Sequence, residues 1–357
     1  MILVTKPYIP NLKKYTKYIS QANEREWLTN FGPLHEELTS RLEEYLGVKN
    51  LLLVSNGTLA LQIAYKALAL EGNVLTTPFS FVATSSSLVW EGLAPKYIDI
   101  DSKNLSLNSK LLPSKPSSRI SAVQAVHVYG NPADIKGLDS YCKRHSLKMV
   151  YDGAHSFGIK INGKSVLLAG DATTLSFHAT KVFHTVEGGA VIFKDRKIYQ
   201  LAKQIINFGY NDSKEIKSIG LNSKLNEYQA AVGLVLLDEI DEIIEKRSAI
   251  LNYYHQKLGD AVEFPIWHQN ANQNGAYAPI LLKSEKELLK VMTGLAKTGI
   301  QTRRYFHPSL NQIRGLGENG NCPVAEDISS RILCLPMYTS LKKLEQNKVI
   351  KHLLELL

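Results

Sequence analysis

The residue of greatest chemical interest is Lys181, which lies between two apolar segments, 174–177 and 190–193, that both have the composition of buried strands. A lysine ammonium is strongly hydrated and is seldom buried without a chemical reason. Either the amine reaches solvent, or the interior of the protein uses an amine. Buried amines form Schiff bases with carbonyl compounds, so Lys181 is a candidate for covalent catalysis.

Two other polar side chains follow a buried strand. Asp152 comes directly after the apolar residues 148–151, and His155 stands three positions later. An aspartate at such a place most often caps a turn or a helix. A lone histidine there is more often a hydrogen-bonded core residue than a catalytic one. The functional alternative is that Asp152 pairs with a protonated nitrogen of a ligand.

The stretch Ser55-Asn-Gly-Thr58 is a candidate anion site. It follows the apolar run 51–54 and opens a helical pattern, so free backbone N–H groups and a positive dipole end point at its turn. Gly57 permits a close approach and Thr58 adds a hydroxyl; the alternative is a simple helix cap. Neither a dinucleotide fingerprint nor a P-loop is present, which argues against a nicotinamide-dependent oxidoreductase and favours a single phosphate over a pyrophosphate.

Short apolar runs separated by helical patterns make up the first two thirds of the chain. This alternation predicts an α/β fold with a mostly parallel sheet covered on both faces. Ligands of such sheets bind beyond the carboxyl ends of the strands, where Ser55–Thr58, Asp152, Ser176 and Lys181 all fall. The expected strands are 51–54, 74–77, 96–100, 121–130, 148–151, 174–177 and 190–193.

The remainder of the chain is expected to form a smaller α/β unit. One long helix over 226–258 is predicted to bridge to it, followed by strands over 277–283 and 332–336 and a final helix. We therefore expect a large domain over 1–245, including the N-terminal segment, and a small C-terminal domain over 246–357.

One chemistry uses all of these groups together. Pyridoxal phosphate needs a lysine for a Schiff base, an acid at its pyridine nitrogen, a flat side chain over its ring and a cup for its phosphate. Phe81, at the start of the helical pattern after Pro78-Phe-Ser80, is the candidate for the flat side chain. Each signal is weak alone, but their joint order along the chain favours this cofactor.

Composition narrows the class of protein. The 357 residues carry a formal net charge of +9, but the basic residues are scattered, so a nucleic-acid-binding or regulatory protein is the less favoured alternative. Three cysteines without a C-x-x-C pair argue against a disulfide framework and against a metal site. No apolar run reaches membrane-spanning length and the start lacks the pattern of a signal peptide, so a cytoplasmic protein is expected.

Nine ordered segments carry a resemblance that extends over nearly the whole chain. They resemble the DegT/DnrJ/EryC1/StrS family of nucleotide-sugar aminotransferases, which have the aspartate aminotransferase fold, fold type I of the pyridoxal-phosphate enzymes. The segments are WLTNFGPLHEEL (27–38), SNGTLAL (55–61), PFSFVAT (78–84), VHVYGNPAD (126–134), YDGAHSFG (151–158), SFHATKVFHTVEGGAV (176–191), GLNSKLNEYQAAVGLVLL (220–237), RRYFHP (303–308) and ILCLPMY (332–338).

The resemblance implies a role for each candidate residue. Lys181 would hold the cofactor covalently and later move the proton, and Asp152 would keep the pyridine nitrogen protonated. A lysine at this place argues against the dehydratase branch of the family, which has histidine there. The remaining cofactor contacts would be His155 near the ring hydroxyl, Phe81 on the ring, and Gly57, Thr58, Ser176 and Asn222 at the phosphate.

Asn222 matches an asparagine that reaches the phosphate from the other subunit, so the resemblance implies a homodimer with a shared site. Lys224, Tyr305, Phe306 and His307 match segments that line the pocket for the sugar nucleotide. His184 stands where close relatives often have asparagine, and we expect it to alter the sugar pocket.

The substrate class comes from the resemblance alone. It implies transfer from an amino acid, expected to be glutamate, through the pyridoxamine form of the cofactor, to a nucleotide-linked 4-keto-6-deoxyhexose. The run H-A-T-K-V-F-x-T-x-E-G-G from His178 resembles the members that aminate C4 of dTDP-4-keto-6-deoxy-D-glucose. Such amino sugars enter O-antigen (lipopolysaccharide) and other surface polysaccharides. Amination at C3 and a UDP-linked substrate are the alternatives within the family.

Overall fold

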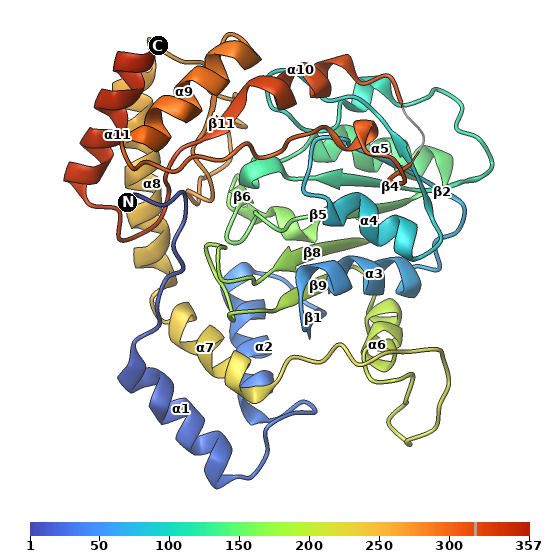
Figure 1. Ribbon diagram of the computed structural model, residues 1–357. Coiled ribbons are helices and arrows are strands. Elements are labelled where there is room, and N and C mark those ends of the chain that lie inside the picture. The colour runs from blue at the N-terminus through green and yellow to red at the C-terminus, as the bar shows by residue number, and fades with distance from the viewer. Residues whose placement is uncertain (318–319) are drawn as a thin grey trace.

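The computed structural model describes residues 1–317 and 320–357 and is built around a seven-stranded sheet (Figure 1). The strands lie in the order β1-β9-β8-β5-β4-β2-β3. Five neighbours, from β3 to β8, pair in parallel, while β9 runs antiparallel to both β8 and β1. The prediction of a mostly parallel α/β sheet is confirmed. The strands are β1 (Leu51–Val54), β2 (Asn73–Thr76), β3 (Ala94–Tyr97), β4 (Ile120–Val126), β5 (Lys148–Asp152), β8 (Ala172–Ser176) and β9 (Gly189–Phe193).

Helices cover both faces of this sheet because its strands are apolar on both sides. In β1, Leu51 and Leu53 belong to the core shared with α2 and α7, whereas Leu52 and Val54 face α3 and α6. This alternation follows from the two-residue period of a strand. The helices of this part are α1 (Leu12–Glu24), α2 (Pro33–Leu46), α3 (Gly57–Ala67), α4 (Ala83–Trp90), α5 (Ile135–His145), α6 (Arg196–Ile205) and α7 (Glu227–Leu237).

The C-terminal part forms its own apolar core around a two-stranded sheet. Ile2 pairs with Ile300, so the first residues of the chain lie against this part and not against the large sheet. The residues on either side of the expected boundary at 245 contribute to different cores, since Ile243 packs with α2 and Ile250 with α9. The elements are α8 (Ile240–Leu258), β10 (Pro279–Leu281), α9 (Glu285–Lys297), α10 (Pro323–Arg331), β11 (Ile332–Cys334) and α11 (Lys343–Leu356), and a small hairpin, β6 (Lys160–Ile161) and β7 (Lys164–Ser165), lies on the larger part.

The prediction of one helix over 226–258 is wrong, because the chain breaks into α7 and α8 at Asp238 and Glu239. α7 is apolar on almost all sides and lies inside the large core, whereas the second half of α8 packs in the C-terminal core. A single straight helix could not place its first half in the large core and its second half in the C-terminal core. Glu239, at the break, accepts hydrogen bonds from Tyr8 at 2.9 Å and Lys14 at 2.8 Å.

Strand β4 ends at Val126, four residues earlier than expected. The residues after it turn sharply, with φ of +59° at Tyr129 and +93° at Gly130. This turn directs the backbone N–H of Tyr129 toward His155.

Across residues 1–317 and 320–357, no helix has the length and apolar character needed to cross a membrane.

Candidate active site

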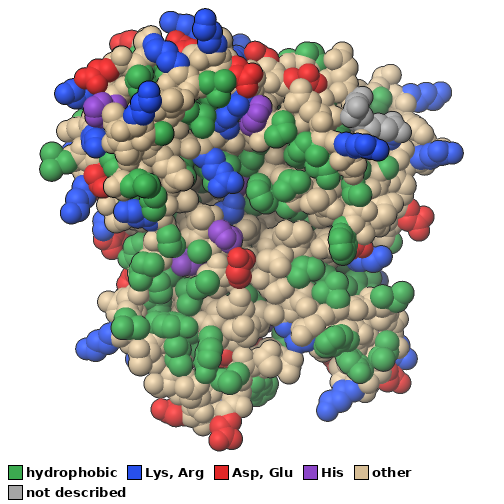
Figure 2. Space-filling model, viewed as in Figure 1, with side chains coloured by type: hydrophobic (Ala, Val, Ile, Leu, Met, Phe, Trp, Pro, Cys, Tyr) green, Lys and Arg blue, Asp and Glu red, His purple; other side chains and the backbone are tan. Residues whose placement is uncertain are grey.

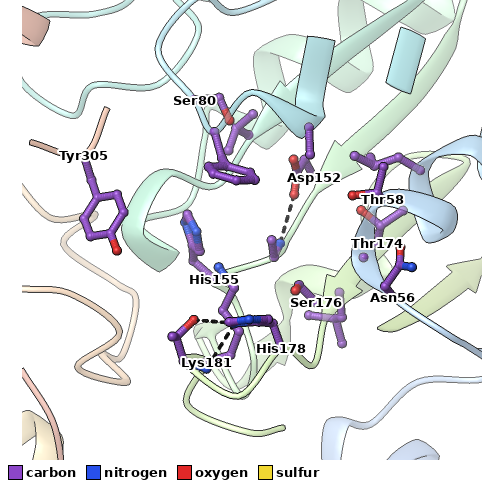
Figure 3. A pocket seen from close by; sticks show the side chains of 18 of the residues that line it. Asn56, Thr58, Ser80, Asp152, His155, Thr174, Ser176, His178, Lys181 and Tyr305 are labelled. Atoms are coloured by element: carbon purple, nitrogen blue, oxygen red, sulfur yellow. Dashed lines mark hydrogen bonds between the residues drawn. The ribbon is translucent and has the colours of Figure 1, made fainter. Parts of the chain in front are cut away.

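A cavity of about 310 Å³ lies at the carboxyl ends of β5 and β8, beside the first turn of α3. The register of the sheet creates it, because Asp152 at the end of β5 pairs with Thr174 of β8. Side chains from the C-terminal part, including Tyr277 and Phe306, form another wall. Figure 3 shows Thr58 and Thr174 at one end of the cavity and Tyr305 at the other. The cavity thus lies beyond the carboxyl ends of the strands, where the sequence predicted a ligand site.

Asp152 is held as an oriented carboxylate and is only 6% exposed. Thr84 Oγ1 of α4 donates to one carboxylate oxygen at 2.8 Å, and the backbone N–H of Ala154 donates to the other at 3.1 Å. Burial raises the pKa of Asp152, while these two hydrogen bonds and the charge of Lys181 act in the opposite direction. A cationic nitrogen in the cavity would stabilise the anionic form of this group.

Lys181 lies in the loop between β8 and β9 and lines the same cavity. Burial lowers the pKa of its amine to about 8, although the charge of Asp152 raises it. Its Nζ is 3.4 Å from the hydroxyl of Tyr277. About one tenth of Lys181 is thus the free amine at pH 7, far more than for an ordinary lysine, and the free amine is the form that attacks carbonyl carbon.

The first turn of α3 provides a cup for an anion. Asn56 caps the helix by accepting from Leu59 N–H at 2.8 Å, which leaves the N–H groups of Gly57 and Thr58 at the cavity. A Cβ on Gly57 would lie 2.8 Å from Ser176 Cβ, so only glycine lets the turn sit against the end of β8. Gly189 of β9 is as closely fitted, because a Cβ there would lie 2.7 Å from the backbone of Asn56.

Aromatic side chains surround the middle of the cavity. Phe81 lines it while remaining 52% exposed, so its ring is available to a planar ligand. His155 is buried, and its ring is parallel to that of Phe306, with 5.9 Å between the ring centroids. Burial lowers the pKa of His155 well below its usual value, and the charge of Lys181 lowers it further, so this imidazole is neutral.

Nine of the predicted site residues meet in this cavity and four lie elsewhere. Those in the cavity are Gly57, Thr58, Phe81, Asp152, His155, Ser176, Lys181, Tyr305 and Phe306. Asn222 pairs with Asn207, and Lys224 Nζ donates to the side chain of Asn207 at 3.0 Å.

His184 is buried, with its Nε2 2.8 Å from the carbonyl oxygen of Tyr8. The Nδ1 of His307 accepts from Arg304 at 2.9 Å. Within one chain, these two histidines and the pair Asn222 and Lys224 are outside the lining of the cavity.

Sequence reasoning did not single out several residues that the structure places here. Thr84 and Arg303 lie within segments that carried the family resemblance, but the sequence alone did not indicate what their side chains contact. His178 and Glu187 flank the lysine loop and approach one another to 3.6 Å. Tyr277 had no sequence signal, because it lies 96 residues from Lys181 and only the packing of the C-terminal part brings it near.

Comparison with known proteins agrees with this geometry. The model of the DegT/DnrJ/EryC1/StrS aminotransferase family matches residues 11–354. The chain is 38% identical to dTDP-4-amino-4,6-dideoxy-D-glucose transaminase of Shigella dysenteriae over 347 residues, covering 95% of each chain. It is 34% identical to the enzyme of the same name from Escherichia coli, covering 99% of this chain and 98% of the relative.

Among solved structures, DesI in the presence of its TDP-sugar product superposes with a TM-score of 0.93 at 29% identity, covering 99% of this chain and 92% of DesI. The expected fold type I architecture is thereby confirmed. The family consists of pyridoxal-phosphate-dependent aminotransferases, and its model spans almost the whole chain, including every residue that lines the cavity. The protein therefore belongs to the DegT/DnrJ/EryC1/StrS aminotransferase family and is a nucleotide-sugar aminotransferase.

Proposed function

We propose that this enzyme transfers an amino group from glutamate to C4 of dTDP-4-keto-6-deoxy-D-glucose, using pyridoxal phosphate bound in the cavity beside Lys181. The observation that carries the reaction type is the meeting of a buried lysine amine of lowered pKa, a fixed carboxylate and an anion cup in one cavity. The substrate rests on the two relatives at 38% and 34% identity, whose names specify a dTDP-linked 4-amino sugar.

The residues of the cavity fit the cofactor group by group. Lys181 offers an amine for its aldehyde, and Asp152 offers an anion for its ring nitrogen. Gly57, Thr58 and Ser176 form a cup in which the lack of a side chain on Gly57 leaves the helix N–H groups accessible to a phosphate. Phe81 supplies a flat apolar surface for the ring. When bound, pyridoxal phosphate supplies an electron-withdrawing ring that stabilises negative charge at the substrate carbon.

The chain itself supplies proton transfer and orientation. Lys181, as a free amine, can remove the proton from the α-carbon of the amino donor and return it later in the reaction. Asp152 cannot reorient, because Thr84 and the backbone of Ala154 each hold one of its oxygens. It would therefore hold a proton on the ring nitrogen of the bound cofactor. Phe306 and Tyr277 form the side of the cavity next to the C-terminal part.

We also propose that the working enzyme is a homodimer. The loop between α6 and α7 exposes apolar side chains, of which Phe208 is 50%, Ile216 67% and Ile219 91% exposed. Apolar side chains also gather in the lower part of the molecule, where this loop, α1 and α7 lie (Figure 2). A second copy would bury such a surface. Asn222 lies in the same loop, so a second copy could bring it to the phosphate cup of its neighbour.

The expected compartment is the cytoplasm, and the expected role of the product is as a precursor of O-antigen or another surface polysaccharide. Cys142, Cys322 and Cys334 are all buried free thiols, which suits a reducing compartment. The net charge of +9 suits a substrate that carries a pyrophosphate.

The proposed substrate is tested by supplying the purified enzyme with pyridoxal phosphate, glutamate and one nucleotide keto sugar at a time. The panel contains dTDP- and UDP-linked 4-keto-6-deoxyglucose and the dTDP-linked 3-keto isomer, with Lys181→Ala as the inactive control. We expect a product from the dTDP-linked 4-keto sugar, with NMR locating the new amine at C4. An amine at C3, or a clear preference for UDP, would replace this assignment with one of the two alternatives.

A further inference from the structure

A short series of hydrogen bonds leads from the backbone to the amine of Lys181. The N–H of Tyr129 donates to His155 Nδ1 at 3.2 Å. The other ring nitrogen, Nε2, is 3.3 Å from the hydroxyl of Tyr277, and that hydroxyl is 3.4 Å from Lys181 Nζ. These contacts join three parts of the chain, since Tyr129 follows β4, His155 follows β5 and Tyr277 precedes β10.

The hydrogen bond from Tyr129 to His155 determines which atom is the donor in the other two hydrogen bonds. Because His155 Nδ1 accepts the N–H of Tyr129, the neutral imidazole carries its proton on Nε2. A protonated imidazole would place an N–H against another N–H, and burial already lowers the pKa of His155 well below its usual value. Nε2–H therefore donates to the oxygen of Tyr277, whose own proton is left to point toward Lys181.

The bonding capacity of the Tyr277 hydroxyl then distinguishes the two forms of the lysine. With a free amine on Lys181, the hydroxyl accepts from His155 and donates to Nζ, so its proton is satisfied. With an ammonium, the hydroxyl must accept from both neighbours, and its own proton has no acceptor among residues 1–317 and 320–357.

We propose that Tyr277 is a positioning residue whose hydroxyl donates a hydrogen bond to Lys181 Nζ and thereby favours the free amine over the ammonium. This inference deepens the proposed function, since it rests on the role given there to Lys181. It adds a residue from the C-terminal part to the control of the reacting amine.

The backbone around Tyr277 is held rigidly enough for this role. Arg247 is buried, and its guanidinium donates to the carbonyl oxygens of Gly275 at 2.9 Å and Ala276 at 3.0 Å. Asn274 donates to the carbonyl oxygen of His155 at 2.9 Å, which ties the segment before Tyr277 to the histidine that orients its hydroxyl. The series of hydrogen bonds from Tyr129 to Lys181 is therefore preorganised in the folded chain.

Other titratable groups also face Lys181 from the walls of the cavity. Asp152 raises the pKa of the amine, and burial lowers it. The remaining titratable or charged side chains that line the cavity are His155, His178, Glu187, Tyr277, Arg303 and Tyr305. Among the described residues, Tyr277 is the side chain within hydrogen-bonding distance of Lys181 Nζ. Removing its hydroxyl therefore changes this hydrogen bond and leaves the charges of the other groups in place.

The test measures the pKa of Lys181 in the full-length, cofactor-free chain. Competitive labelling with acetic anhydride between pH 6 and pH 11, followed by mass spectrometry of the peptide containing Lys181, gives its titration curve directly. In Tyr277→Phe we expect the pKa to rise by about one unit, so that labelling at pH 7 falls about tenfold. The matched control is Tyr45→Phe, which removes a hydroxyl bonded to Asp241 outside the cavity and leaves the Lys181 curve unchanged.

An unchanged or lowered pKa of Lys181 in Tyr277→Phe overturns the inference, because the hydroxyl would then be inert or an acceptor for the ammonium. If this variant does not fold, the wild-type protein still decides. ¹⁵N-histidine NMR should show His155 as the Nε2–H tautomer from pH 5 to pH 9, and titration or an Nδ1–H tautomer overturns the inference. Neither measurement uses a sugar, so a wrong substrate would leave both results intact.

Discussion

At the scale of single residues, burial and the mutual attraction of charges have opposite effects on the pKa values of Lys181 and Asp152. Burial drives the amine toward its neutral form and weakens the acidity of the carboxyl group, while the attraction between their charges acts against burial in both groups. The chain therefore retains two buried titratable groups whose desolvation costs stability. Such groups are typical of sites where their chemistry is used.

The buried amine leads to a prediction about stability. The pKa of Lys181 is about 8 in the folded chain against 10.5 ordinarily, so between these values the unfolded chain binds more protons and stability rises with pH. At pH 7, Lys181→Met should make the cofactor-free protein more stable by up to about 3 kcal/mol. Urea unfolding measures this gain, which should disappear by about pH 10.5. A less stable variant at pH 7 would contradict it.

A second prediction concerns Asp152. Asp152→Asn preserves the shape of the side chain, which Thr84 and the Ala154 N–H hold in place, but removes the charge proposed to hold a proton on the ring nitrogen. We expect turnover to fall by about 100-fold or more, because a preorganised charge in a dry site is lost. Steady-state kinetics measure the change, and circular dichroism checks that the fold is retained. Near-normal turnover would refute the role given to Asp152.

At the scale of elements, the site depends on how closely α3 sits on the ends of β8 and β9. Gly57 and Gly189 permit this contact, and the cap by Asn56 leaves the first N–H groups of the helix facing the cavity. The position of the anion cup is thus a packing property of a helix and two strands.

Gly57→Ala tests this property. Its Cβ would lie 2.8 Å from Ser176 Cβ, so the first turn of α3 must move away from β8. We expect the affinity for pyridoxal phosphate to fall by about tenfold or more, since about 1.4 kcal/mol of lost contact has that effect. Titration followed by absorbance measures the affinity, and the melting temperature reports any general loss of stability. Unchanged affinity would place the phosphate elsewhere.

Another element-scale contact is far from obvious in the sequence. Glu227 of α7 is fully buried and accepts the N–H groups of Leu34 at 2.9 Å and His35 at 2.8 Å, so it caps α2. Glu227→Gln should lower the free energy of unfolding by about 1–3 kcal/mol, because one buried N–H loses its acceptor. Glu36→Gln, an exposed change in the same helical turn, is the control and should have an effect below about 0.5 kcal/mol. Equal effects in urea unfolding would show that the cap is unimportant.

At the scale of the whole molecule, the proposed dimer accounts for two of the four predicted site residues that lie outside the cavity of one chain, whereas His184 and His307 bond to Tyr8 and Arg304 within that chain. Asn222 and Lys224 belong to the loop whose apolar side chains are exposed. If a second copy covers that loop, each cavity receives side chains from both subunits.

Mixing inactive variants tests the shared site. In a mixture of Lys181→Ala and Asn222→Ala subunits, the mixed dimer has one site with both changes and one site with neither. Random exchange should restore about one quarter of the wild-type sites, because half of the dimers are mixed and each has one intact site. Native mass spectrometry, with one of the two variants labelled with ¹⁵N, confirms exchange, and the transfer assay measures the recovery. No recovery after proven exchange would refute the contribution of Asn222 across subunits.

The sequence determined the class of fold and the central residues of the candidate site. The short apolar runs between helical patterns, and the order of Ser55–Thr58, Asp152 and Lys181, depend on local pattern and on the rule that parallel strands end at one edge. Only the tertiary structure decided the break between α7 and α8 and the contacts of Thr84, Tyr277 and Glu227. These contacts join residues between 68 and 193 positions apart. Their existence depends on how whole helices and the C-terminal part pack, which no local pattern in the chain encodes.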